Sequence, residues 1–281
     1  MRTGIIRIGR NNLNRIFLTL LFSIIAFITI SPLLWALSTS LKTDLEVLEK
    51  PYNLFPEKLQ FQNYRTVFTI LPFLLYFKNS VVVSATVIVG TLVTSSLAAY
   101  AFSRLHFKGR TVLFMLYLAT LMVPRQVVLV PNFVILRNLG LLDNLWSLIL
   151  TGVFTAYGTF FLRQFFLSLP IELEEAAIID GLGHFGRLAL IIIPLAKPAL
   201  VTLTIITLLN IWNDFLFPLV FINSDINRTL TIGLSLLRGD YDTRWNIVMA
   251  ATLLSITPLL ALFVFAQRFF IEGIALSGIK G

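Results

Sequence analysis

Long stretches without any charged side chain are the feature that most constrains this chain. Four of them run for 19 to 26 residues, at positions 16–41, 79–103, 144–162 and 245–267. The apolar core of a bilayer is about 30 Å thick and is crossed by about 20 helical residues. In lipid, each backbone polar group must be bonded within the protein, so such stretches are expected to be helices. The sequence therefore predicts an all-α polytopic membrane protein.

The composition supports this interpretation and excludes other classes. Hydrophobic residues make up 57% of the 281 residues and charged residues only 13%, whereas soluble proteins carry roughly 25% charged residues. A typical cytosolic enzyme and a disordered chain are both excluded. The absence of cysteine excludes disulfides and cysteine-ligated metals.

Two further stretches are interrupted by charges. The first is uncharged from Thr111 to Pro124 and is followed by Arg125. The second begins at Leu188, is interrupted by Lys197, and is then uncharged up to Asp214. Both lie between strong spans, so we count both as membrane helices. Pro194 and Pro198 remove backbone donors and predict a kink or a broken start in the second. The sequence thus predicts about six helices, at roughly 14–37, 79–103, 111–131, 144–166, 190–222 and 246–268.

The basic residues predict the orientation. The N-terminus has four arginines and the 104–110 loop three basic residues, with no acid in either, whereas the 42–76 segment is mixed in charge. Basic loops face the cytoplasm. Both termini are therefore expected in the cytoplasm, together with the 167–187 segment and the tail 268–281. The outer segment 42–76 is expected on the opposite face of the membrane. This accounts for the net charge of +8 without a nucleic-acid surface. We expect a single transmembrane domain over 1–281, in contact with membrane lipid.

No pattern indicates an active site. The two histidines, His106 and His184, fall in different loops without metal-ligand spacing, so no metal is expected. No glycine-rich phosphate loop precedes a Lys-Ser or Lys-Thr pair, so the chain is not expected to bind ATP in that way. We predict that it is not an enzyme and carries no cofactor of its own.

The cytoplasmic segment 169–187 contains an unusual acidic helix. Pro170 suits a first helical turn, and Glu172, Glu174 and Glu175 follow where the helix dipole favours acids. Ala176 and Ala177 give a small apolar face, and Gly181 and Gly183 end the helix. Such a helix can dock in a groove of another protein. The alternative is a helix lying on the membrane, which the acidic character disfavours because surface helices usually carry basic residues.

Polar residues near the end of the fifth span are the second candidate site. Asn210 and Asp214 are four residues apart on one helical face, with Asn213 beside them. Acids inside a span mark function by default, so this face is a candidate for the substrate path. The alternative is that Asp214 holds a helix end or a loop near the outer interface.

The same regions resemble a known family. The residues that carry the resemblance are Glu175-Ala-Ala-x-x-Asp180-Gly181, Ile193-Pro194-Leu-x-x-Pro198, Asn79-Ser80, Ala99-Tyr-Ala-Phe-Ser-Arg104-Leu-x-Phe-x-Gly109-Arg110, Trp212-Asn213-Asp214-Phe215-Leu-x-Pro218, Arg244-Trp245-x-x-x-Met249-Ala250-Ala251 and Gln267-Arg268-Phe-Phe-Ile-Glu272-Gly273 with the tail to Gly281. The first resembles the EAA motif of ABC-importer permeases. The set resembles the shorter permease subunit of carbohydrate importers of the maltose and glycerol-3-phosphate type. It covers about residues 30–281.

This resemblance implies a function and a set of partners. It implies the type I importer transmembrane fold in an inner membrane, alternating access, a second homologous permease, a homodimer of ATPase subunits that binds ATP and Mg, and an external solute-binding protein. The implied ATPase-coupling residues are Glu174, Glu175, Ala176, Ala177, Asp180 and Gly181. The implied ATPase contacts of the C-terminal tail are Gly278, Lys280 and Gly281.

The solute and two competing functions stay open at this point. Glycerol-3-phosphate, oligosaccharides, trehalose and glucosylated polyols all fit the resemblance. A self-sufficient secondary transporter would need acid pairs or coupling-ion sites near the middle of the membrane, and Asp214 is the only acid well inside a predicted span. A membrane scaffold protein is the third reading, and the acidic EAA segment argues against it.

Overall fold

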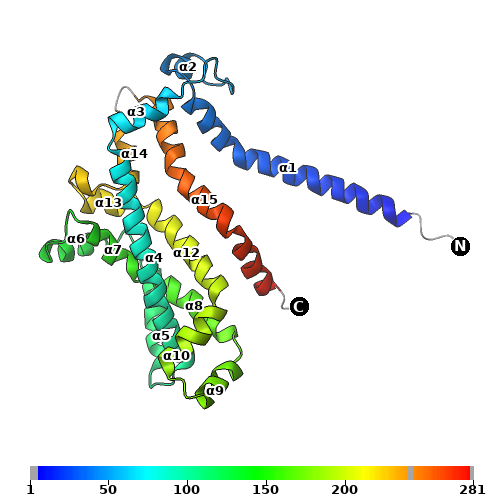
Figure 1. Ribbon diagram of the computed structural model, residues 1–281, viewed down its shortest axis with the longest axis vertical. Coiled ribbons are helices and arrows are strands. Elements are labelled where there is room, and N and C mark those ends of the chain that lie inside the picture. Colours follow the sequence, from blue (N-terminus) through cyan, green and yellow to red (C-terminus); the bar gives the residue numbers. More distant parts are fainter. Residues whose placement is uncertain (1–5, 240–242, 279–281) are drawn as a thin grey trace. The chain divides into compact units, whose positions relative to one another are not determined.

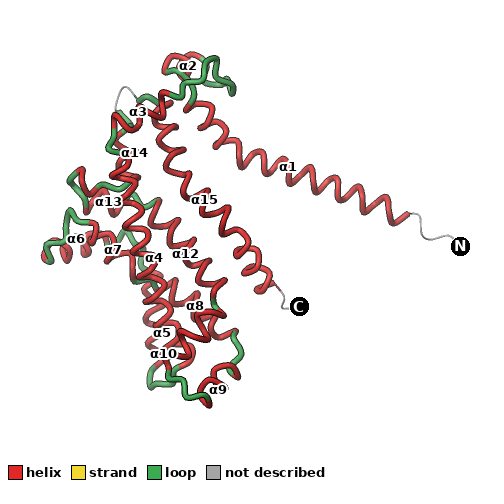
Figure 2. The backbone as a smooth tube through the Cα atoms, in the orientation of Figure 1, coloured by secondary structure: helices red, strands yellow, loops and turns green. Residues whose placement is uncertain are grey.

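The computed structural model is helical throughout the part of the chain that it describes (Figure 1). It describes the backbone of residues 6–239 and 243–278 and the side chains of residues 14–239 and 243–264. Figure 2 shows helices joined by turns and loops, with no strand among these residues. The predicted all-α class is confirmed.

Among the described residues, four helical segments are long and apolar enough to cross a membrane. They are Asn14–Ser40, Phe73–Arg104, Leu145–Ser168 and Trp245–Val264. A bent pair, His184–Leu195 with Lys197–Trp212, can supply a fifth, and Arg110–Met122 is a shorter apolar helix. These six segments agree with the predicted number of about six.

Two predicted spans differ from the structure in detail. The third ends at Met122 instead of continuing to 131, and α6 (Leu129–Asn138) is a separate helix. Pro124 lies between the two helices, and it has no backbone N–H with which to continue the helical hydrogen bonds. The fifth bends by 79° between Leu195 and Lys197, at the break expected from the two prolines. It ends at Trp212, and α13 (Leu216–Phe221) follows as a helix of its own.

Contacts divide the chain into two compact units. The first comprises Met1–Leu71 with Leu237–Ser255, and the second Pro72–Leu236 with Ile256–Gly281. The first unit contains α1 (Ile6–Ser40), α2 (Asp44–Glu49), α3 (Gln62–Ile70) and the start of α15 (Trp245–Gly278). In the most apolar 18-residue stretch of α1, no residue is buried by the rest of the chain.

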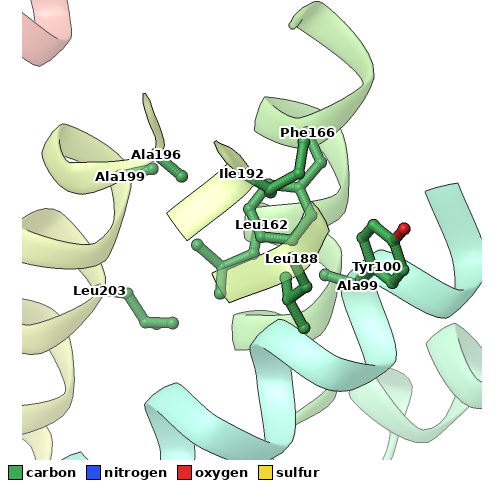
Figure 3. Packing of buried hydrophobic residues seen from close by; sticks show 9 residues of the cluster. All are labelled: Ala99, Tyr100, Leu162, Phe166, Leu188, Ile192, Ala196, Ala199 and Leu203. Atoms are coloured by element: carbon green, nitrogen blue, oxygen red, sulfur yellow. The ribbon is translucent and has the colours of Figure 1, made fainter. Parts of the chain in front are cut away.

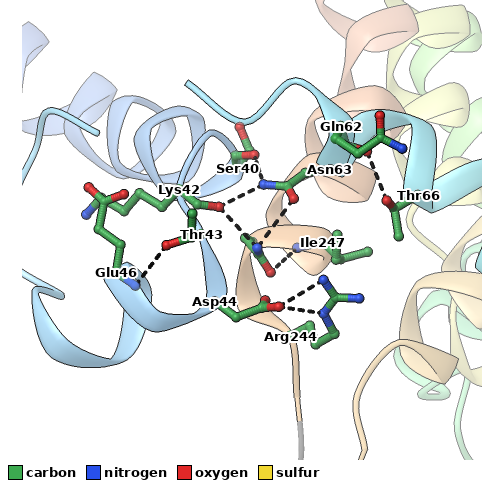
Figure 4. A network of polar contacts seen from close by, with 11 residues as sticks. Ser40, Lys42, Thr43, Asp44, Glu46, Gln62, Asn63, Thr66, Arg244 and Ile247 are labelled. Carbon is green, nitrogen blue, oxygen red and sulfur yellow. Dashed lines mark hydrogen bonds and ion pairs between the residues drawn. The ribbon is translucent and has the colours of Figure 1, made fainter. Parts of the chain in front are cut away.

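A polar network holds the first unit together at one end of its helices (Figure 4). The Asn63 side-chain amide donates to the carbonyls of Ser40 and Lys42, at 2.8 and 2.9 Å, and the Asn246 amide donates to Lys42 at 3.1 Å. Arg244 pairs with Asp44 at 2.9 Å. Because Asn63 and Asn246 are buried, these bonds replace water and fix the ends of α1 and α3 against the start of α15.

The second unit is built around α4 (Phe73–Arg104). It packs against α7 (Leu145–Val153), α8 (Ala156–Ser168) and α12 (Lys197–Trp212). Gly90 faces Val153, and a Cβ built on Gly90 would lie 2.7 Å from that side chain, so only glycine permits this approach. Small residues allow membrane helices to approach closely in this way.

One hydrophobic core of the second unit lies where α4, α8 and α12 meet (Figure 3). Its buried members are Ala99, Tyr100, Leu162, Phe166, Leu188, Ile192, Ala196, Ala199 and Leu203. Leu188 and Ile192 belong to a single π-helical turn that follows α10 (His184–Arg187). The core therefore fixes the segment 184–203 against α4 and α8.

Candidate functional site

The acidic helix of the sequence is α9 (Glu172–Ile179), and a glycine turn ends it. Gly181 has φ of 81°, a left-handed conformation that favours glycine. Its N–H donates to Ile178 at 3.0 Å, and the N–H of Leu182 donates to Ala177 at 2.9 Å. This pair of bonds is the Schellman motif, which satisfies the last carbonyls of the helix. The Asp180-Gly181 turn therefore fixes the direction in which the chain leaves α9.

Glu174 is buried and joins α9 to the end of α4. Its side chain is 4% exposed, and Oε1 lies 2.6 Å from Nε of Arg104, whose side chain is 8% exposed. The Tyr100 hydroxyl donates to Oε2 at 3.4 Å. Arg104 Nη2 also donates to the carbonyls of Phe166 and Leu169, at 2.7 and 2.9 Å. One guanidinium therefore ties together α4, the end of α8 and α9.

The six predicted coupling residues divide into two groups. Glu174 and Ala177, three residues apart, face the bundle and are buried. Glu175, Ala176, Asp180 and Gly181 are exposed. The structure thus separates residues that hold α9 in place from residues that a partner can reach. Their role in coupling stays a prediction.

Two features of this site were not anticipated from the sequence. Arg104 was placed in a basic loop and in a motif of the resembled family but not as the partner of Glu174, although a buried glutamate needs a cation or several donors nearby. Ile179, the last residue of α9, is 87% exposed, and Phe185 in the α10 helix that follows is 79% exposed. Large apolar side chains this exposed in a short polar segment indicate a partner surface.

A groove runs between α9 and the loop that follows α4. Its volume is about 600 Å³, and it is lined by Arg104, Leu105, His106, Phe107, Ile171, Glu174, Glu175, Ile178, His184 and Arg187. His184 Nδ1 lies 2.6 Å from Nη2 of Arg187. The groove combines basic and apolar groups with the exposed carboxylate of Glu175.

Asp214 lies at the junction of α12 and α13. Its Oδ1 accepts from the Phe217 N–H at 3.3 Å, and its carbonyl accepts from the Thr231 hydroxyl at 2.7 Å. Its Oδ2 pairs with Arg125 Nη2 at 3.3 Å. Arg125 also lies over the Phe217 ring, 4.6 Å from its centroid. The Asp214 carboxylate therefore holds the first turn of α13.

The other two residues of the predicted substrate path are placed differently. Asn210 and Asn213 are exposed, and Asn213 donates to the Leu209 carbonyl of its own helix at 2.9 Å. Asp214 instead lines a small pocket with Arg125, Ser80, Ser84, Thr151 and Thr229. Arg125 was not a candidate from the sequence, where it marked only the end of a span.

Asp143 fixes a turn near the far end of the second unit. Its Oδ1 accepts from the backbone N–H groups of Ser224 and Asn223, at 2.9 and 3.0 Å, and from the Ser224 hydroxyl. These bonds, the Ser224 N–H first among them, lower the pKa of the Asp143 carboxyl below its ordinary value of 3.8. Asp143 has φ of 55°, so the bonds also stabilise a left-handed residue.

The predicted C-terminal contacts fall at the edge of the described chain. Gly278 is the last residue of α15, and its surroundings are not described. Lys280 and Gly281 lie outside the described residues. Their role stays a prediction.

Comparison with protein families gives a match over about two thirds of the chain. Residues 90–275 match the model of the binding-protein-dependent transport system inner membrane component. The match includes α9, Asp214 and the C-terminal part of α4.

Curated relatives align over nearly their full length. The arabinooligosaccharides transport system permease protein of Halalkalibacterium halodurans is 37% identical over 94% of this chain and 96% of its own. The sulfoquinovosyl glycerol permease protein of Agrobacterium fabrum is 36% identical, covering 89% of this chain and 88% of its own. The sn-glycerol-3-phosphate transport system permease protein of Brucella abortus is 33% identical, and the alignment covers 94% of this chain and 95% of that one.

A solved structure shares the fold. A chain of a bacterial ABC transporter involved in the import of the acidic polysaccharide alginate superimposes with a TM-score of 0.84. It is 25% identical, and the alignment covers 93% of this chain and 98% of that one.

Proposed function

Because the chain belongs to the family of binding-protein-dependent transport system inner membrane components, we propose that it is the translocation subunit of an ATP-driven importer. Its solute is a sugar, an oligosaccharide or a polyol-type compound, which is the chemistry that the relatives' names describe. It is a permease subunit and not an enzyme. ATP and Mg belong to a separate subunit.

The observation that carries this proposal is the way α9 is mounted. The ion pair of Glu174 with Arg104 anchors the helix to α4, and the opposite face presents Glu175 and Asp180. In the proposed complex this face enters a cleft of the ATPase. Glu175 pairs with a basic residue there, and Ala176 permits close approach. The Gly181 turn sets the angle at which the chain leaves the cleft.

The same mounting supplies a mechanical route into the membrane. Arg104 bonds to Glu174 and also to the carbonyls of Phe166 and Leu169. A displacement of α9 when the ATPases close on ATP is therefore transmitted to α4 and α8 together. Rigid-body motion of packed helices is the established way in which such a displacement becomes alternating access.

The proposed assembly has four further subunits. They are a second, homologous permease, two ATP-hydrolysing subunits and an external solute-binding protein, the last in keeping with the family's description. The apolar surface of α1 faces lipid or the second permease. Both termini lie in the cytoplasm of a bacterium or archaeon, and Gly278, Lys280 and Gly281 reach the ATPases.

We propose that Asn210, Asn213 and Asp214 face the solute path. Asn210 and Asn213 are exposed polar residues at the end of an apolar helix, which supports a water-lined surface there. Asp214 adds a carboxylate beside them.

The test is a charge reversal on the exposed face of α9. In the purified complex, Glu175→Arg is expected to abolish solute uptake while the ATPase subunits still hydrolyse ATP, because the cationic partner is repelled. Glu172→Arg, on the same helix and also exposed, is the control and should retain most uptake. ATP hydrolysis and uptake are measured together in proteoliposomes. Full uptake by this chain alone, without ATP, would overturn the proposal.

A further inference from the structure

We propose that the pocket beside Asp214 is a binding subsite for the hydroxyl groups of a neutral sugar or polyol, and that Arg125 is its lid. The inference rests on the proposed function and adds the residues that contact the solute. The pocket lies wholly within the second unit, among α4, α7, α12 and α13.

The lining has the chemistry that polyols require. It contains four hydroxyl groups, one carboxylate and one aromatic ring, which are Ser80, Ser84, Thr151, Thr229, Asp214 and Phe217. Hydroxyls and a carboxylate bond to sugar O–H groups, and an aromatic face covers the apolar C–H surface of a sugar ring. Binding sites typically combine a few placed polar groups with an apolar wall in this way.

Ser84 points to a ligand most directly. Its side chain is 2% exposed, and its hydroxyl has no hydrogen-bond partner among the described residues. The neighbouring hydroxyls are occupied, because Ser80 accepts from the Leu230 N–H at 2.8 Å and Thr151 donates to Ser147 at 2.8 Å. A buried hydroxyl without a partner costs free energy and calls for a bound group.

Arg125 closes this pocket and is suited to leave it. It comes from the turn between the 3₁₀ helix Thr120–Met122 and α6, and its side chain is 52% exposed. An ion pair this exposed holds weakly. Asp214, 14% exposed, is fixed by its bond to the Phe217 N–H. Arg125 is therefore the member of the pair that can swing away.

The present volume is that of a closed site. About 20 Å³ is open inside, which is room for one water-sized group. When Arg125 turns outward, the free Oδ2 of Asp214, the ring of Phe217 and the Ser84 hydroxyl are uncovered together. A carboxylate left without its cation repels phosphate and other anions, so the site selects neutral hydroxyl groups.

Cysteine labelling tests the lid, because the natural chain has no cysteine. Ser84→Cys is made in the assembled complex and treated with a small hydrophilic thiol reagent. Labelling should be slow, and adding Arg125→Ala should speed it about tenfold. Gln126→Ala, next to the lid, should have no effect. Equal labelling with and without Arg125 overturns the lid.

Protection from labelling tests the ligand class. In the Ser84→Cys, Arg125→Ala double variant, millimolar arabinose, glucose or glycerol should slow the labelling of the introduced thiol, and glycerol-3-phosphate should not. Protection by none of the neutral compounds, or by the phosphate alone, overturns the subsite. The assay needs no ATP, so its failure is distinct from a failure of ATP-driven uptake, which would overturn the proposed function instead.

Removing the hydroxyl separates a ligand role from a structural one. Ser84→Ala should raise the KM for uptake of the transported sugar by about two- to tenfold, the loss of one hydrogen bond, without lowering thermal stability. Ser95→Ala is the matched control, because Ser95 is also buried and unpartnered but lies outside the pocket. Equal KM values in the two variants, or reduced stability in Ser84→Ala, would contradict the assignment.

Discussion

Two ion pairs, one at the end of α4 and one beside the pocket near its start, are built from the same kinds of group but differ in burial. Arg104 and Glu174 have side chains that are 8% and 4% exposed, and Arg125 and Asp214 have side chains that are 52% and 14% exposed. The first pair is also bonded to Tyr100 and to two backbone carbonyls. The second has an aromatic ring under its cation.

The difference assigns opposite tasks to the two pairs. A buried charge without its partner is costly, so the Arg104 pair acts as a permanent joint between α9 and the bundle. A half-exposed cation loses little when it moves into water, so the Arg125 pair is able to open. The changes at Glu174, Asp214 and Arg125 below test this contrast, and a change at Asp143 tests a third fixed carboxylate.

The largest effect is expected at the buried joint. Glu174→Ala leaves Arg104 buried without its carboxylate and should lower the free energy of unfolding by about 3–5 kcal/mol. Thermal unfolding of the purified protein in detergent measures it. Glu175→Ala, next in sequence but exposed, should change stability by less than about 0.5 kcal/mol. Equal effects of the two changes would refute the distinction between the faces of α9.

A smaller loss is expected at Asp214. Asp214→Ala removes both the bond to the Phe217 N–H and the partner of Arg125, and should cost about 1–2 kcal/mol, as for other helix-capping residues. The same unfolding experiment applies. Asn213→Ala, at an exposed side chain, removes only the bond to the Leu209 carbonyl of its own helix and serves as the control. If the two variants unfold alike, Asp214 does not hold the start of α13.

Asp143 should add an acid dependence to stability. Its pKa is lowered in the folded protein, so its stabilising contribution is complete above the ordinary carboxyl pKa near 4 and is lost as the pH falls through the lower, folded value. Asp143→Asn keeps an acceptor but not the charge and should cost about 1 kcal/mol at neutral pH. Unfolding followed from pH 6 to about pH 3 checks this. If the stability of the natural protein and that of the variant depend on pH in the same way, Asp143 does not contribute this acid dependence.

The smallest effect is expected at the lid. Arg125→Ala should change the free energy of unfolding by less than about 1 kcal/mol, because the pair is half exposed. Gln126→Ala provides the baseline in the same measurement. A loss as large as that of Glu174→Ala would show that Arg125 is a second fixed joint, and the contrast between the two pairs would fail.

The helices could be predicted from the length of the uncharged stretches, because this part of the fold depends on local sequence and not on tertiary contacts. The all-α class and the six apolar segments are confirmed. The end of the third span at Met122 and the separate α6 were missed, because an uncharged run does not reveal where the chain leaves a helix. The 79° bend was signalled by Pro194 and Pro198, whose effect on the backbone is local.

The site was predicted as a segment but not residue by residue. Glu174 and Glu175 are adjacent and identical in chemistry, and they are distinguished by Tyr100 and Arg104, about seventy positions earlier, which contact Glu174. Arg125 and Asp214 are likewise joined by the fold, 89 residues apart. Pairings of this kind depend on helix register and packing, which a single sequence does not contain. The family resemblance is confirmed by the comparisons, because it depends on motifs in order.

The polar network of the first unit has a consequence for biosynthesis. Asn63 contacts Asn246 across 183 residues, and both contact the Lys42 carbonyl. Since chains emerge from the ribosome N-terminus first, the Asn63 amide can bond the end of α1 early, whereas the bond from Asn246 has to wait for almost the whole remaining chain. The network around the end of α1 is thus started by the first part of the chain and completed by the last. A truncated product released before residue 246 would keep the Asn63 bonds but lack the one that joins α1 to the start of α15.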